Sequence, residues 1–235
     1  MKRVPTIYNL DLHVHSKYSH DSTLQPETII KISRKRGLSG IAITDHNTMA
    51  GAEKMRSLAG DDFMVIPGSE ISTDKGDVIG LFLNENITSR RFIDVIDIIK
   101  DQGGISILPH PYKNKFANPE DLVTDVDMVE VMNSRISKKL NEKASILSKK
   151  FGKKIAAGSD AHTSFEIGRV RLVLTGERIS NNSEDIRKYL LDGKVNTWGN
   201  TSPFHIRMLS AGIGKYNKAG ITGLFNAGLR KILLR

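Results

Sequence analysis

The sequence predicts an α/β fold in which βα repeats surround a largely parallel sheet. From about residue 7 to residue 176, short apolar runs alternate with longer segments of helical spacing, and this alternation is typical of βα units. The runs are mostly apolar rather than strictly alternating, as expected of strands covered on both faces. A chain of 235 residues can bury one substantial core, so we expect a single domain.

Eight apolar runs are expected to form strands. In chain order they cover residues 7–15, 40–45, 63–71, 77–83, 104–110, 128–134, 154–160 and 170–176. Gly76 and Asp77 offer an alternative in the third unit, where they would join two antiparallel strands. Residues 26–37 have helical spacing, with Pro26 suited to the first turn and Gly37 to a C-terminal cap. A helix near 137–150 is basic on its polar side, which we interpret as a solvated face rather than a nucleic-acid stripe.

Residues 201–235 differ in character from residues 1–200, which are expected to form the main domain. Their charged side chains are all basic: Arg207, Lys215, Lys218, Arg230, Lys231 and Arg235. Intervening glycines weaken a continuous amphipathic helix. We therefore expect a basic, helical extension that docks on the domain or forms a homo-oligomer contact, in preference to a membrane anchor.

Composition narrows the class of protein further. The chain has no cysteine, which excludes disulfides and thiolate metal sites and suits a reducing compartment. No run of about 20 apolar residues exists, and the N-terminal segment reaches charged residues too early for a signal peptide. We expect a cytoplasmic protein without membrane insertion. The net charge of +9 favours anionic partners.

Polar side chains gather at the ends of the expected strands. At or just past their C-terminal ends lie His13, His15, Asp45, His46, Glu70, His110, Asn133, Asp160 and His162. In α/β barrels and open parallel sheets this edge carries the chemistry. Five of the seven histidines lie at these strand ends. If they had only structural roles, each of the five positions would need its own unrelated explanation. The set predicts a metal centre.

Two pairs at a spacing of two residues strengthen this prediction. His13 and His15 project to one face of a strand and can grip one cation, although such a pair is weak by itself. Asp160 and His162 repeat the spacing at another strand end. On a loop after His15, either Asp21 or its neighbour His20 would add a ligand.

The remaining acids and histidines are expected to complete the centre. Glu70 has two carboxylate oxygens that can bridge neighbouring cations, and His110 is restrained between two prolines. His46 is expected as a ligand. The adjacent Asp45 is expected to support the site through hydrogen bonds instead.

In their order along about residues 9–170, the motifs DLHVHS, Asp21, TDHNT, PGSEIS, LPHP, EVMNSR and GSDAH resemble the PHP (polymerase and histidinol phosphatase) family of metallo-phosphoesterases. The resemblance implies a distorted TIM-like (β/α)7 barrel over residues 1–200 with a di- or trinuclear site. It implies three metal positions, held by His13, His15, Glu70 and Asp160; by Glu70 and His110; and by Asp21, His46 and His162.

One position departs from the family pattern. Several members have a further histidine ligand where this sequence has Asn133, a much weaker ligand, so two or three ions are expected. Mn²⁺, Fe²⁺ and Zn²⁺ all suit nitrogen and oxygen ligands. The EVMNSR motif resembles the branch of small stand-alone PHP proteins that act on nucleotides or short oligonucleotides.

Four residues are candidates for substrate binding. Arg135 can hold a phosphate by bidentate hydrogen bonds, and Lys113 is a second candidate cation. Asn133 and Ser16 are candidate polar contacts. The alternatives are that Arg135 and Lys113 are surface cations and that Ser16 caps a turn.

The expected activity is hydrolysis of a phosphate ester of a nucleotide or short oligonucleotide, with a metal-bound water as the nucleophile. Three alternatives stay open. The first is a phosphatase for a small molecule such as histidinol phosphate, and the second is an amidohydrolase that cleaves C–N bonds. The third is a nucleic-acid-binding module whose metal site is structural.

Overall fold

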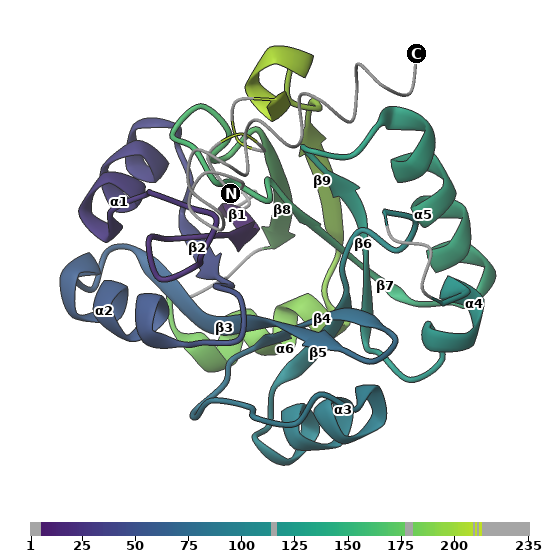
Figure 1. Ribbon diagram of the computed structural model, residues 1–235. Helices are drawn as coiled ribbons and strands as arrows, with labels where there is room; N and C mark the ends of the chain where they lie inside the picture. Colours follow the sequence, from purple (N-terminus) through teal and green to yellow (C-terminus); the bar gives the residue numbers. More distant parts are fainter. Residues whose placement is uncertain (1–5, 114–116, 177–180, 209, 211, 213–235) are drawn as a thin grey trace, which may run out of the picture.

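The strands form one nine-stranded sheet that curls into a nearly closed barrel (Figure 1). The computed structural model describes residues 6–113, 117–176, 181–208, 210 and 212. The strands are β1 Thr6–Val14, β2 Gly40–Ile43, β3 Met64–Thr73, β4 Gly76–Leu81, β5 Ile105–Leu108, β6 Met128–Asn133, β7 Lys154–Gly158, β8 Val170–Gly176 and β9 Val195–Gly199. Their order in the sheet is β7-β6-β5-β4-β3-β2-β1-β8-β9.

Neighbouring strands run parallel except in four pairs: β4 with β3 and β5, and β8 with β1 and β9. Strands β1, β2 and β3 run parallel, as do β5, β6 and β7, and β4 is antiparallel to both of its neighbours. Thr73 pairs with Gly76 across the tight turn between β3 and β4, so the third unit is antiparallel, but Gly76 and Asp77 lie in β4 and the turn itself is at residues 74–75.

The ring closes where the residues that follow β7 meet the C-terminal end of β1. The backbone N–H of Asp160 donates to the carbonyl of His13 at 2.7 Å, and that of His15 donates to the carbonyl of Ala161 at 3.0 Å. The N-terminal half of β1 pairs instead with the antiparallel β8, from Thr6–Gly176 to Leu10–Leu172. This split pairing of β1 distorts the barrel.

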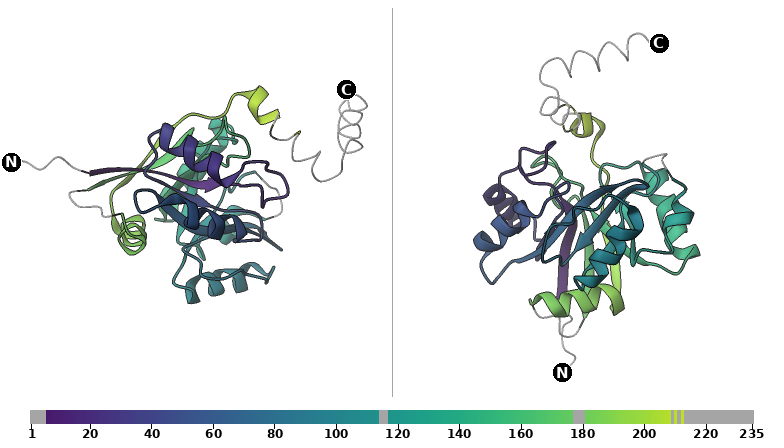
Figure 2. Two further views of the ribbon diagram at one scale, coloured as in Figure 1. Left: turned by 90° about the vertical axis from the view of Figure 1, so that its left-hand side faces the viewer. Right: turned by 60° about the horizontal axis from the view of Figure 1, so that its bottom comes forward.

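Helices cover the outside of the barrel and one of its ends. They are α1 Pro26–Lys35, α2 Ala50–Ala59, α3 Phe92–Asp101, α4 Pro119–Leu122, α5 Lys138–Lys150 and α6 Ser183–Asp192. One apolar cluster fills the barrel and is closed by Ile186 and Leu190 of α6, which lies across the end of the sheet (Figure 2). A second cluster joins the sheet to α3, α4 and α5, and a third joins it to α1 and α2.

The segment after β9 packs beside the loop that follows β6. The Ser202 N–H donates to the carbonyl of Ser134 at 2.6 Å, and Arg207 donates to the carbonyl of Arg135 at 3.3 Å. Residues 213–235, the greater part of the expected extension, lie outside the described residues, so its oligomer contact stays a prediction. None of the helices in the described part of the chain combines the length and hydropathy needed to cross a membrane.

Candidate metal centre

The eight side chains expected as ligands converge at the C-terminal ends of the barrel strands. They come from β1 and the residues after it (His13, His15, Asp21), from the residues after β2 (His46), from β3 (Glu70), and from the residues after β5 (His110) and β7 (Asp160, His162). Their nitrogen and oxygen atoms form three overlapping groups, each with all its atoms within 4.8 Å of one another. Residues up to about 150 positions apart thus share one site.

A deep cluster consists of His13, His15, Glu70, His110 and Asp160, each at most 5% exposed. The Nε2 atoms of His13 and His15 lie 3.1 Å apart, and each lies 3.3 Å from Glu70 Oε2. The other oxygen, Glu70 Oε1, lies 3.0 Å from His110 Nε2. Glu70 therefore joins two groups of donors, which is the arrangement a bridging carboxylate needs.

An outer cluster consists of Asp21, His46 and His162. Asp21 Oδ2 lies 2.9 Å from His162 Nε2 and 3.5 Å from His46 Nε2. The Asp21 and His46 side chains are 21% and 18% exposed, and Asp21 Oδ1 is buried with no hydrogen-bond partner among the described residues. His20, the alternative to Asp21, is exposed and brings only its ring to 5.2 Å from that of His46.

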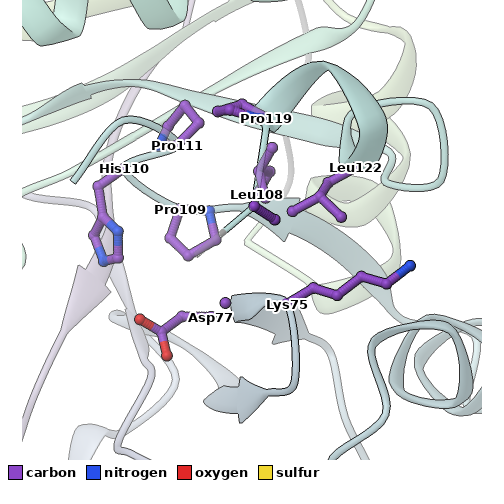
Figure 3. Close-up of a pocket in the computed structure, with 10 residues that line it drawn as sticks. Lys75, Asp77, Leu108, Pro109, His110, Pro111, Pro119 and Leu122 are labelled. Carbon is purple, nitrogen blue, oxygen red and sulfur yellow. The ribbon is translucent and has the colours of Figure 1, made fainter. Parts of the chain in front are cut away.

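Two of the deep donors lie on strained backbone. His110 has a φ of 29° and Asp160 a φ of 54°, a region that costs a non-glycine residue roughly 1–3 kcal/mol. Prolines 109 and 111 hold His110 at the edge of a narrow pocket of about 30 Å³ (Figure 3). Such strain is concentrated at functional sites; here the His110 side chain contacts Glu70, and the Asp160 side chain lies beside His13 and His15.

Two cationic side chains stand beside the deep cluster. Arg135 Nη1 lies 3.4 Å from Asp160 Oδ1 and 2.6 Å from His162 Nδ1. Lys113 Nζ lies 3.6 Å from Asp160 Oδ2 and 3.5 Å from His110 Nε2. The side chains are 17% and 41% exposed, so both cations lie between the buried donors and the solvent.

Comparisons with known proteins agree with these motifs. The sequence profile of the PHP domain matches residues 11–86, and the PHP-associated profile matches residues 138–195. An uncharacterised protein of Methanocaldococcus jannaschii is 41% identical over 138 residues, which cover 53% of this chain and 81% of that protein. The chain belongs to the PHP family.

Solved structures share the fold of this PHP chain at low identity. A two-domain protein from Bacteroides vulgatus that contains a predicted PHP-like metal-dependent phosphoesterase superposes with a TM-score of 0.73 at 19% identity, over 83% of this chain and 66% of that one. An amidohydrolase from Chromobacterium violaceum with bound sulfate superposes with a TM-score of 0.59 at 17% identity, over 68% of this chain and 90% of that one. These likenesses show the fold alone.

Glu130, which the sequence reading missed, supports the deep cluster of this PHP site. Its carboxylate is 2% exposed and lies 2.9 Å from His13 Nδ1. It also accepts from the His110 N–H at 2.8 Å and from the Asn133 amide at 2.9 Å. A carboxylate on the far nitrogen of a histidine fixes the ring and its tautomer. The available signal was a lone acid inside the apolar strand MVEVM.

Further buried carboxylates hold the loops around the site. Asp45 accepts from the N–H and the hydroxyl of Ser16, both at 2.6 Å, which is the supporting role expected of it. Asp11 accepts from the N–H and hydroxyl of Ser159 and from the Gly168 N–H. The Ser16 hydroxyl is buried in this contact, and a contact of Ser16 with substrate stays a prediction.

Asn133 and Glu166 complete the surroundings. The Asn133 amide donates to Glu130 and, at 3.3 Å, to Asp160 Oδ2, while its oxygen accepts from the Arg135 N–H at 2.9 Å. Asn133 thus connects the deep cluster to the Arg135 loop. Glu166, also missed by the sequence reading, accepts from the N–H groups of His162 and Thr163.

The electrostatics of the site favour ionised acids and a neutral His162. Burial alone would raise the pKa of Glu70, but His13 and the other histidines hold it well below its usual value. Burial would likewise raise the pKa of Asp160, and Lys113 and His13 keep it well below its usual value. Burial lowers the pKa of His162 to about 4, helped by the nearby His15. Burial alone would lower the pKa of His15, but Asp160 and Glu70 raise it to about 9, so an ion bound by His15 would displace a proton.

The donor set fits divalent ions. It offers imidazole nitrogen and carboxylate oxygen only, which suits Mn²⁺, Fe²⁺ and Zn²⁺. Asp21 Oδ1 has no hydrogen-bond partner among the described residues although it is buried, and such an atom is costly unless something else binds it. An ion held by the outer cluster would remove that cost.

Proposed function

We propose that this chain is a metal-dependent phosphoesterase that hydrolyses phosphate esters of nucleotides or short oligonucleotides. The observation that carries the proposal is the contact between the donors and the cations: Arg135 and Lys113 both lie within 4 Å of the Asp160 carboxylate. A site for a phosphate ester needs divalent ions and positive side chains next to one another.

The ligand roles follow from the two clusters. In the proposal the deep cluster holds two ions, joined by Glu70, and the outer cluster together with His15 holds a third. The ions are Mn²⁺, Fe²⁺ or Zn²⁺. When bound, such ions lower the pKa of a coordinated water and neutralise charge on the phosphate.

The protein's own groups then bind and orient the ester. Arg135 can present two N–H donors to one phosphate, and its backbone N–H is anchored on the Asn133 side chain. Lys113 adds a second charge from the other side of Asp160. Glu130 keeps the His13 ring in place through Nδ1 while Nε2 faces Glu70.

The experiment is a measurement of phosphate release with added Mn²⁺, Fe²⁺ or Zn²⁺, together with the metal content of the protein. The substrates are nucleotides, oligonucleotides, histidinol phosphate and a set of amides. The double variant His13→Ala, His15→Ala is compared with the parent, and His205→Ala, an exposed histidine outside both clusters, is the control.

Phosphate release from nucleotides or oligonucleotides, lost in the double variant and kept in the control, is the expected result. If the protein hydrolysed only histidinol phosphate, its substrate would be a small-molecule phosphate ester rather than a nucleotide or oligonucleotide. Cleavage of amides alone would favour the amidohydrolase chemistry of the Chromobacterium violaceum neighbour. Metal-supplemented protein that hydrolyses nothing yet binds nucleic acid would favour the binding module.

A further inference from the structure

The outer face of β8 and β9 carries arginines beside an exposed tryptophan, away from both clusters. Arg171 of β8 pairs directly with Trp198 of β9, so both side chains point to the same face of the sheet. The Arg171 guanidinium carbon lies 4.4 Å from the centroid of the Trp198 ring. The Trp198 side chain is 56% exposed. One side of the ring is therefore held by arginine and the rest is open to solvent.

Two more arginines join this face. Arg171 donates to the carbonyl of Arg36 at 3.2 Å, and Arg36 donates to the carbonyls of Phe165 and Ile167. Arg169 donates to the carbonyl of Thr201 at 3.3 Å. These partners are neutral carbonyl groups, which position the guanidinium groups without cancelling their charge.

Positive charge accumulates there; the buried Asp11 is an acid whose charge acts on Arg36 and Arg171, but it forms no ion pair with them. None of Arg36, Arg169 and Arg171 forms an ion pair with a described carboxylate, whereas Arg34, Arg91 and Arg187 each do so on other surfaces. The Nε atoms of Arg169 and Arg171 are buried without a hydrogen-bond partner among the described residues. Burial and the nearby Arg169 also lower the pKa of Arg36. An anion at this surface would relieve the repulsion.

We propose that Arg36, Arg169, Arg171 and Trp198, the arginine–tryptophan face, bind a single-stranded oligonucleotide. Guanidinium groups bind successive phosphates, and the open side of the Trp198 ring stacks on a base; this combination of charge and aromatic surface is how single strands are bound without sequence preference. A second exposed aromatic, Phe165, lies at the Arg36 end of the face and is 56% exposed.

The face is continuous with the rim of the metal centre. The Asn200 N–H donates to the Arg169 carbonyl at 3.0 Å, and Ser202, two residues further, donates to Ser134 beside Arg135. A strand whose end lies at Arg135 can therefore continue over this short segment to Trp198. This part of the inference rests on the proposed function and makes its substrate an oligonucleotide rather than a mononucleotide.

The test uses the only tryptophan of the chain as its own probe. The full-length protein is titrated with an uncleavable phosphorothioate oligothymidylate of about twelve nucleotides, within the range that single-strand sites cover. Trp198 emission and the anisotropy of a labelled oligonucleotide are followed at several salt concentrations. We expect quenching that saturates together with the anisotropy change, and an affinity that falls as salt rises.

Variants distinguish binding at the arginine–tryptophan face from nonspecific attraction to the protein's positive charge. Trp198→Ala is expected to weaken binding at least about fivefold, the lower end for loss of one stacked base, with Trp198→Phe closer to the parent. Arg171→Gln is expected to weaken binding and to reduce the salt slope by about 0.7, while Arg171→Lys keeps the slope. The control is Arg187→Gln on α6, which removes the same charge from another surface.

Each outcome decides one question. Quenching of Trp198 in the parent, with weaker binding by anisotropy only in the Trp198 and Arg171 variants, supports the face even if the protein hydrolyses no phosphate ester, in which case the proposed function fails alone. Binding without quenching, or equal weakening by Arg171→Gln and Arg187→Gln, overturns the face. Hydrolysis of mononucleotides without any oligonucleotide binding overturns the face and leaves the phosphoesterase standing.

Discussion

The deep and outer clusters use the same residue types but are built differently. Every deep donor is buried, and His13, His110 and Asn133 all contact the single carboxylate of Glu130. The outer cluster is open to solvent at Asp21 and His46. Its third member, His162, is buried, and its Nδ1 lies 2.9 Å from the carbonyl of Asp160, whereas His46 is anchored through its backbone N–H, which donates to the Ser19 hydroxyl.

The difference teaches where the site is preorganised. Buried donors that are fixed by second hydrogen bonds lose little freedom when an ion binds. Partly exposed donors must be ordered by the ion itself, and water competes for them. We therefore expect the deep ions to bind more tightly and to govern activity, and the outer ion to bind more weakly and to tune it.

The largest effect is expected from Glu70→Gln, since Glu70 contacts donors of both clusters. The amide cannot bridge two cations, so metal content should fall by two ions and kcat/KM by more than about 1000-fold. Elemental analysis and steady-state kinetics measure the two changes. Glu85→Gln, at an exposed position, is the control. Full metal content in Glu70→Gln would rule out a bridging role.

A smaller but clear effect is expected from Glu130→Gln, because Glu130 contacts the deep donors His13 and His110, as well as Asn133. Loss of a carboxylate behind a histidine ligand typically costs about 10–100-fold in metal affinity or activity. Competition with a fluorescent chelator would measure the affinity of each ion separately. If the affinity for the outer ion fell as much as the affinity for the deep ions, the two clusters would not bind their ions independently.

Much of this arrangement could be predicted from the sequence, because strand ends carry their polar residues in a fixed order. The eight strands expected up to residue 176 all form, and the eight expected donors converge. The donors followed from local patterns: a short apolar run, then a histidine or an acid.

The parts that the sequence did not reveal depend on contacts between distant segments. Glu130 lies within a strand and resembles any polar interruption until His13, 117 positions away, is seen beside it. Strand β9 has only partly buried or exposed residues and no apolar pattern. The pairing of Arg171 with Trp198 likewise exists only once β8 and β9 are in register.

Asp21→Asn tests the outer cluster alone. The amide keeps the shape of the side chain but removes the charge opposite His46 and His162, so one ion should be lost and kcat/KM should fall roughly tenfold. Metal content should drop by one, in contrast to two for Glu70→Gln. A titration with a weak chelator should show the same ion leaving the parent protein first.

His20→Ala is expected to have the smallest effect, and it tests whether the outer cluster includes this solvent-exposed residue. His20 is next to Asp21 in sequence and its ring lies 5.2 Å from that of His46, yet it is exposed and belongs to none of the three donor groups. Metal content should not change, and kcat/KM should stay within about twofold, as for most surface substitutions. If His20→Ala lost one ion and Asp21→Asn lost none, His20 rather than Asp21 would be the residue that binds the outer ion together with His46 and His162.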